Sequence, residues 1–331
     1  MTSVALPTAA GRPLWRAAQL LGVLLTLALI GALWATPTVA LRVLWDMVIP
    51  LLPAVFLVNP LIWRNVCPLA TLNDVTGNAP GRPRMEATLT RAGWVVGVVL
   101  LFVLVPARRF LFNENGPALA LTIVVVAVLA VATGLFFGRR AGFCSSICPV
   151  LPVEKLYGQS PIAPLHGARC SECTVCTPIG CIDLAGPKTI PQTIGPLRRD
   201  SGWVRTGFGA FAAAFPGFIL AYFTASNGAL ATAPAVYLRV LGFAAASYAI
   251  VWAAATAFRV RAAVALPLLG ATALGLYYWY ATPTLVEAYG APEMVLPVLR
   301  VVIGALVAFW LAAAWPAMRA GSGDAAAARP R

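Results

Sequence analysis

Charged side chains are scarce in this chain of 331 residues. They make up 11% of the sequence, whereas 60% of the residues are hydrophobic and the mean hydropathy is +0.83. A soluble domain carries about 25% charged residues. So few charges cannot cover a water-exposed surface of this size. The composition therefore excludes an ordinary soluble globule and predicts a protein whose main partners are membrane lipids.

Histidine and catalytic motifs are also nearly absent. His166 is the single histidine, so two axial histidines for a haem b cannot come from this chain. The sequence has no Walker loop, no GxGxxG turn and no nucleophile–histidine arrangement, so nothing indicates nucleotide binding or hydrolysis. His166 precedes Cys170 by four residues. We favour a solvated loop residue over a cluster ligand or a proton carrier.

Long apolar stretches dominate what remains. Eight are about long enough to cross a bilayer core of roughly 30 Å. They cover residues 14–36, 39–61, 89–107, 117–138, 203–225, 235–258, 262–282 and 295–317. The second contains Asp46, Pro50 and Pro53, which predict a kink or a partly re-entrant path. For Asp46 we favour an ion pair with Arg42, four residues earlier, over a role toward quinone or protons.

The basic residues are distributed unevenly between the loops. With eight spans both termini share a side, and 19 of the 24 lysines and arginines fall on that side. The positive-inside rule makes it the cytoplasmic side. We therefore predict a multi-pass protein of the bacterial inner membrane with N- and C-termini cytoplasmic. Because the positive charge follows the loops rather than forming a patch, no nucleic acid partner is predicted.

All seven cysteines fall on the same predicted side, in or beside the loops 61–91 and 139–202. They are Cys67, Cys144, Cys148, Cys170, Cys173, Cys176 and Cys181. Cysteines that only fill the core would be spread through the spans, and disulfides are disfavoured in the reducing cytosol. Seven thiols gathered at one face indicate a metal.

The run Cys170-Ser-Glu-Cys173-Thr-Val-Cys176 is the strongest motif, and four residues separate it from Cys181. Three thiolates at two-residue gaps can surround three irons of one cubane, while the fourth iron takes a cysteine from elsewhere. Structural zinc usually takes two separated pairs instead. The spacing favours an iron–sulfur cluster, with zinc as the rival.

Two Cys-Pro elements complete the set. Cys144-Ser-Ser-Ile-Cys148-Pro149 follows the fourth span, and Trp63-Arg-Asn-Val-Cys67-Pro68 follows the second. If the first is helical, its i and i+4 cysteines share one face. A cysteine before proline ligates the other cluster in ferredoxin runs, and Cys148 takes that place here. We interpret the two elements as halves of a degenerate repeat, with a plain buried thiol as the alternative for Cys67.

These motifs resemble the membrane-bound 4Fe-4S ferredoxin-type proteins of bacterial respiration. That group includes the quinol dehydrogenase membrane component of periplasmic nitrate reduction, the nitrous-oxide reductase regulator and cytochrome oxidase accessory proteins. The resemblance covers about residues 40–185 and implies cysteine-ligated clusters, a quinone partner and membership of a respiratory complex. The chain departs from it in one missing leading cysteine, a single ferredoxin run and four further spans without cysteine.

Counting thiols leaves the number of clusters open, since two cubanes need eight ligands and the chain has seven. One allocation places Cys148 with the run and leaves a second site of three. The alternative allocation keeps the three cysteines of the run together with Cys181 and leaves the other three as a partial site. The first cluster would use Cys170, Cys173, Cys176 and Cys148, and the second Cys67, Cys144 and Cys181; in the rival the first uses Cys170, Cys173, Cys176 and Cys181.

The predicted architecture is all-α, a polytopic transmembrane helical bundle with a small cytoplasmic iron–sulfur insertion. Its segments are residues 1–138 (four spans), 139–202 (the ferredoxin-like segment), 203–318 (four spans) and 319–331 (a disordered tail). We expect electron transfer between the quinone pool and a redox partner such as a ferredoxin or flavodoxin, or other subunits of a complex. A redox-sensing or maturation factor and a zinc-stabilised transporter or structural protein are the alternatives. Whether the chain is itself an enzyme stays open.

Overall fold

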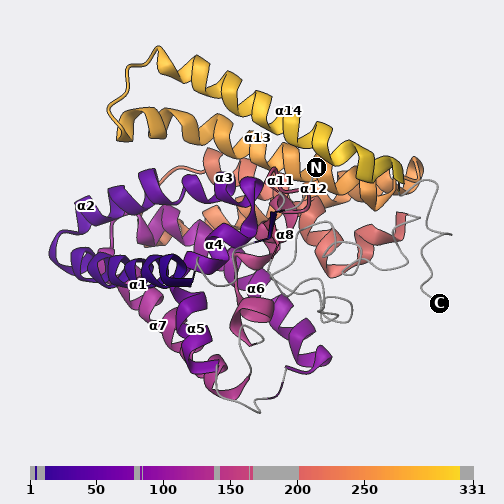
Figure 1. Cartoon of the computed structure of the whole chain (residues 1–331). Helices are drawn as coiled ribbons and strands as arrows, with labels where there is room; N and C mark the ends of the chain where they lie inside the picture. Colours follow the sequence, from indigo (N-terminus) through magenta and orange to yellow (C-terminus); the bar gives the residue numbers. More distant parts are fainter. Residues whose placement is uncertain are drawn as a thin grey trace.

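The computed structural model describes residues 4–5, 12–77, 83, 85–137, 142–163, 165–166 and 201–320. Within these ranges, eight helices are long and apolar enough to cross a membrane, as predicted. They are Pro13–Ala35, Pro37–Val58, Thr88–Phe112, Gly116–Phe136, Gly207–Thr224, Leu230–Ala257, Ala262–Ala288 and Val295–Trp315. The prediction of an all-α, polytopic transmembrane helical bundle is confirmed (Figure 1).

Several spans are built from more than one element, and short helices lie between spans. The first half contains α1 (Arg12–Ala35), α2 (Pro37–Arg42), the π-helix η1 (Val43–Val48), α3 (Leu51–Val58), α4 (Pro60–Val66), α5 (Pro68–Gly77), α6 (Ala87–Ala107), the π-helix η2 (Arg108–Phe112) and α7 (Gly116–Phe136). Then follow the π-helix η3 (Phe143–Ile147), α8 (Leu151–Tyr157), the 3₁₀ turn η5 (Ser201–Arg205), α11 (Gly207–Thr224), the 3₁₀ turn η6 (Leu230–Thr232), α12 (Ala233–Ala257), α13 (Ala262–Ala288) and α14 (Val295–Ala320). Two-residue strands β1 (Val4–Ala5) and β2 (Leu165–His166) pair in parallel.

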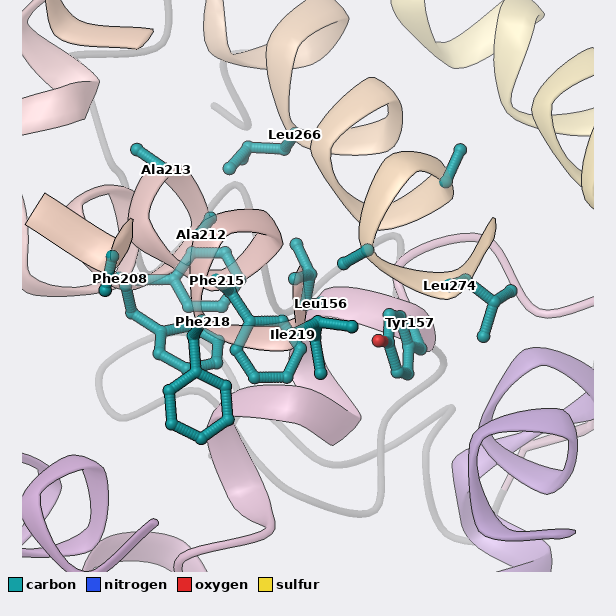
Figure 2. Close-up of a cluster of buried hydrophobic side chains, with 14 of the residues drawn as sticks. Leu156, Tyr157, Phe208, Ala212, Ala213, Phe215, Phe218, Ile219, Leu266 and Leu274 are labelled. Carbon is teal, nitrogen blue, oxygen red and sulfur yellow. The ribbon is translucent and has the colours of Figure 1, made fainter. Parts of the chain in front are cut away.

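The helix α11 forms the centre of the bundle. Its phenylalanines recur every three or four residues, so they line one face and stack along it. The rings of Phe211 and Phe215 are 4.9 Å apart between centroids, and those of Phe215 and Phe218 are 5.6 Å apart. Figure 2 shows this aromatic column beside Leu156 and Tyr157 of α8. The short helix α8 is therefore packed against the core although it is not one of the eight spans.

The helices α1 and α14 lie at the periphery. Leucines along α1, such as Leu21, Leu24 and Leu25, are more than half exposed, and Val301 of α14 is 71% exposed. In water such a surface would be an aggregation liability, whereas in a bilayer it faces lipid tails. The exposed apolar side chains thus agree with a membrane location.

The second span bends at a π-helix. Its backbone passes from α2 through η1 to α3, and Ile49 N donates to Leu44 O in the i to i+5 pattern of a π-turn. The predicted ion pair between Asp46 and Arg42 is wrong. Asp46 instead accepts from Arg108 of the third span, with Nη2 and Oδ1 3.2 Å apart.

One end of the bundle gathers the elements that hold the described cysteines. There the indole of Trp203 in η5 donates to Val260 O at 2.9 Å, and Gln159 after α8 donates to Leu266 O at 3.0 Å. The spans preceding Cys67 and Cys148 both run toward this end. We call it the cysteine end. The opposite end carries Arg109, whose carbonyl accepts from Gly228 N in the loop before α12.

The helix α14 reaches Ala320, two residues into the segment predicted as a disordered tail. The predicted iron–sulfur segment, residues 139–202, lies largely outside the described residues. The predicted division into segments stays a prediction.

Candidate functional site

The turns at Cys67 and Cys148 have nearly the same backbone conformation. Cys67 ends α4 with φ −59° and ψ 124°, and Cys148 ends η3 with φ −58° and ψ 120°. This extended ψ is what a following proline favours, and it stops the preceding helix. Each cysteine carbonyl then accepts a hydrogen bond from the next helical element, from Thr71 N at 3.0 Å and from Leu151 N at 3.2 Å. The two Cys-Pro elements are therefore alike in structure as well as in sequence.

Each Cys-Pro element packs against the span that precedes the other one. The helix α5, which follows Cys67, lies along α7 (Figure 1), where Asn73 Nδ2 donates to Ala130 O at 2.8 Å. The segment after α8 returns to α3, where Ile162 N donates to Leu57 O at 3.1 Å. We call this arrangement the reciprocal exchange. It holds the two elements against each other as a pair.

A glycine in an earlier span lets each element come close to a helix backbone. A Cβ on Gly22 of α1 would lie 2.6 Å from Val66 O, the carbonyl before Cys67. A Cβ on Gly97 of α6 would lie 3.0 Å from Ile147 O, the carbonyl before Cys148. Only glycine permits such an approach. The first and third spans thus support the two turns in the same way.

The reciprocal exchange brings Cys67 and Cys148 within electrostatic reach of each other. The pKa of the Cys148 thiol is raised to about 12. Burial is the largest cause, and the nearby Cys67 and Glu154 contribute in the same direction. Because thiolates bind metals, a metal at Cys148 would have to displace the thiol proton.

Charged side chains surround the pair. Arg64, three residues before Cys67, and Glu154 of α8 form a buried two-pronged ion pair, in which Arg64 Nη2 donates to Glu154 Oε2 at 2.9 Å and Nε donates to Oε1. The ammonium of Lys155 lies over the ring of Trp94, 5.1 Å from its centroid. Burial, followed by the repulsion of Arg64, lowers the pKa of Lys155 to about 8. Near neutral pH this group of three carries a net positive charge, which is complementary to thiolates.

The remaining predicted ligands are placed only in part. Cys144 is half-buried in η3, but within the described residues no three cysteine, histidine or acidic side chains gather into a metal site. Cys170, Cys173, Cys176 and Cys181 lie outside the described residues. Cys67 lies within electrostatic reach of Cys148, and the predicted ligand set stays a prediction.

The 144–148 element is helical, as the predicted alignment of its two cysteines requires, but the helix is of the π type. Residues Phe143–Ile147 form a π-helix, and Cys148 N donates to Phe143 O at 3.0 Å, five residues back. Four residues are close to one full turn in a π-helix as well, so the predicted common face of Cys144 and Cys148 stays a prediction. His166 takes part in the β1–β2 pair, opposite Ala5.

Sequence reasoning missed Arg64, Glu154, Lys155 and Tyr157. Arg64 and Lys155 were counted only as loop charges and Glu154 was not considered, yet the structure buries the ion pair of Arg64 and Glu154 between two short helices. A signal for their burial was available in the sequence. Each of the three lies in a short, mostly apolar stretch next to a Cys-Pro element, and a solvated loop would contain fewer apolar residues. Tyr157 has no such signal, since its importance depends on packing against distant spans.

The fold and the site define a polytopic α-helical membrane protein with two structurally similar Cys-Pro turns that meet at one end of the bundle. Comparison with models of known protein families found no match. Comparisons with curated proteins and with solved structures likewise found none.

Proposed function

We propose that this protein transfers electrons in the membrane, using one or two [4Fe-4S] clusters bound at the cysteine end. It would exchange electrons between the quinone pool and a redox partner of the ferredoxin or flavodoxin type, or another subunit of a respiratory complex. The observation that carries the proposal is the meeting of Cys67 and Cys148 in two like-shaped turns. Two separate loops deliver thiols to one place, as a cluster shared between chain segments requires.

The number of thiols in reach supports a cluster ligated from several segments. Cys67 and Cys148 alone supply half of the ligands of a cubane, so further thiolates must come from the run at Cys170, Cys173 and Cys176. The 22-residue separation of Cys148 and Cys170 is ample for this, because an extended chain covers roughly 3.3 Å per residue. The electrostatic interaction between Cys67 and Cys148 favours one shared cluster, or two adjacent ones, over two distant sites.

The charges around the turns support an anionic cofactor. Arg64 and Lys155 exceed Glu154 by one positive charge, and the loops at this end are basic. Positive potential stabilises thiolate clusters and attracts acidic electron carriers. With the positive-inside rule, the cysteine end is cytoplasmic, and the protein belongs in the bacterial inner membrane with both termini cytoplasmic.

The test is anaerobic purification followed by iron, acid-labile sulfide and zinc analysis, with EPR spectra of the reduced protein. We expect iron and sulfide in equal amounts and a cubane signal. Cys148→Ser and Cys67→Ser should each lose iron and alter the signal. Ser145→Ala, which changes a hydroxyl between two cysteines but no thiol, is the matched control and should keep both.

Zinc in place of iron would overturn the proposal. Full iron and an unchanged EPR signal in both serine variants would show that the two turns hold no cluster, and would remove the observation on which the proposal rests.

A further inference from the structure

A cavity of about 400 Å³ lies inside the bundle, between α3, α8, α11 and α13. Aromatic side chains form much of its wall, among them Trp45, Phe56, Phe215, Phe218, Tyr277 and Tyr280. Its volume falls in the range of small-molecule sites, which are mostly apolar with a few placed polar groups.

The polar groups of the cavity lie in two places. Near the end opposite the cysteines, Arg108 and Arg109 line it. Arg108 donates to Asp46 Oδ1 at 3.2 Å and to Tyr222 Oη at 3.1 Å, so it is held in position. Arg109 donates through Nη1 to Asn227 Oδ1 at 3.0 Å, but its buried Nε has no hydrogen-bond partner among the described residues. This end can therefore still donate to an acceptor.

The second polar group is the hydroxyl of Tyr157 on α8. Tyr157 lines the cavity, is 1% exposed, and its hydroxyl has no hydrogen-bond partner within the described part of the chain. Figure 2 shows the oxygen pointing toward Ile219, another cavity-lining residue. A buried phenol normally finds a partner, because an unsatisfied one carries the full cost of its desolvation. The missing acceptor indicates a ligand.

We propose that this cavity binds the ring of a quinone-class lipid, with one ring carbonyl accepting a hydrogen bond from Tyr157 and the opposite side of the ring directed toward the arginine end. The choice of a quinone rests on the proposed function, whereas the cavity and the unpaired hydroxyl do not. A quinone ring is flat, uncharged and has acceptors on opposite edges. It therefore suits aromatic walls between two separated donors.

A lipid acyl chain fits the same space less well. It would fill the apolar volume but would leave the hydroxyl of Tyr157 without an acceptor. A lipid phosphate could bind at the arginines, yet it would leave the hydroxyl of Tyr157 without an acceptor. The position of Tyr157 therefore favours a ring with its own acceptor over a tail.

The cavity also adjoins the cysteine turn. Val150, two residues after Cys148, lines it, and Val153 and Tyr157 follow on the same short helix. One side of α8 thus faces the cavity, and Cys148 lies just before the start of this helix. A ligand in the cavity would lie beside the segment that carries the proposed cluster ligand.

The test measures binding of a ubiquinone analogue with one isoprene unit, and of the corresponding naphthoquinone, to the purified full-length protein in detergent. Quenching of tryptophan fluorescence reports binding, since Trp45 lines the cavity. Tyr157→Phe should weaken binding by about five- to tenfold, the equivalent of one hydrogen bond. Ala281→Phe, which fills the cavity from α13, should abolish it. Tyr248→Phe, the same change outside the cavity, should leave the affinity unchanged.

Equal affinities in native protein, Tyr157→Phe and Ala281→Phe would overturn the proposal. So would competition by a saturated fatty alcohol as effective as that by the quinone, which would identify a lipid-tail cavity. Thermal melting of each variant shows whether it is folded. Iron analysis of the same samples separates the two proposals: binding without iron refutes only the cluster, and iron without site-dependent binding refutes only the cavity ligand.

Discussion

Removal of the Tyr157 hydroxyl should stabilise the ligand-free protein. A buried hydroxyl without a partner costs about 1–3 kcal/mol. Tyr157→Phe deletes this group but keeps the ring, which packs 6.2 Å from Phe215 between centroids. The void left by one oxygen, about 15 Å³, costs only about 0.4 kcal/mol. The net gain is about 0.6–2.6 kcal/mol, or roughly 1–4 °C in melting temperature for a chain of this size.

Tyr278→Phe is the matched comparison. Its hydroxyl is also buried, but it donates to Pro50 O at 2.9 Å. Its removal leaves a buried carbonyl unpaired, so this variant should lose about 1–3 kcal/mol. Thermal melting in one detergent, without added quinone, compares the two. If Tyr157→Phe melts as far below the native protein as Tyr278→Phe does, the hydroxyl of Tyr157 has a partner and the reasoning fails.

Added short-chain quinone should then narrow or reverse the advantage of Tyr157→Phe. A ligand stabilises the folded state by RT ln(1 + [L]/Kd), so the tighter binder gains more at any given concentration. The native protein should therefore rise further in melting temperature than the variant. An equal rise in both would show that the ligand does not contact the hydroxyl.

Three further predictions concern packing and charge. Gly22→Ala places a methyl group against Val66 O and should cost about 1–3 kcal/mol, whereas Gly31→Ala in the same helix meets nothing within 4 Å and should stabilise by about 0.5–1 kcal/mol; melting curves compare them. Asp46→Asn should lower the stability by up to about 1 kcal/mol, and Arg42→Ala should change it by less than about 0.5 kcal/mol. A larger loss in Arg42→Ala than in Asp46→Asn would instead support the ion pair between Asp46 and Arg42. Glu154→Gln leaves its buried arginine partner uncompensated and should cost about 3–5 kcal/mol in the same assay, so an unchanged melting temperature would contradict the burial of that pair.

The spans could be predicted from the sequence because membrane crossing is decided locally. About 20 consecutive apolar residues are needed whatever the rest of the chain does, so a window over the sequence suffices. The Cys-Pro turns were predictable for a similar reason. A proline restricts the backbone of the residue before it, and that restriction gives Cys67 and Cys148 their common conformation.

The partners across the bundle could not be predicted in this way. Asp46 was assigned to Arg42 from their spacing of four residues, whereas its partner, Arg108, comes from another span. Arg64 and Glu154 are 90 residues apart, and no local pattern joins them. The cavity depends on side chains from several helices at once. Such contacts are fixed by packing, which a single sequence does not specify.

The reciprocal exchange has a consequence for biosynthesis. A chain emerges from its N-terminus, so Cys67 is made and its span inserted well before α7 and α8 exist. Its helix α5 can pack on α1 from the start, but it gains its larger packing surface only when α7 arrives, and α8 then packs against α3, which is already in the membrane. The two thiols cannot face each other before the fourth span is in place. Any cofactor held between them must therefore be inserted late, after the first half of the protein has been assembled, rather than as the first cysteine leaves the ribosome.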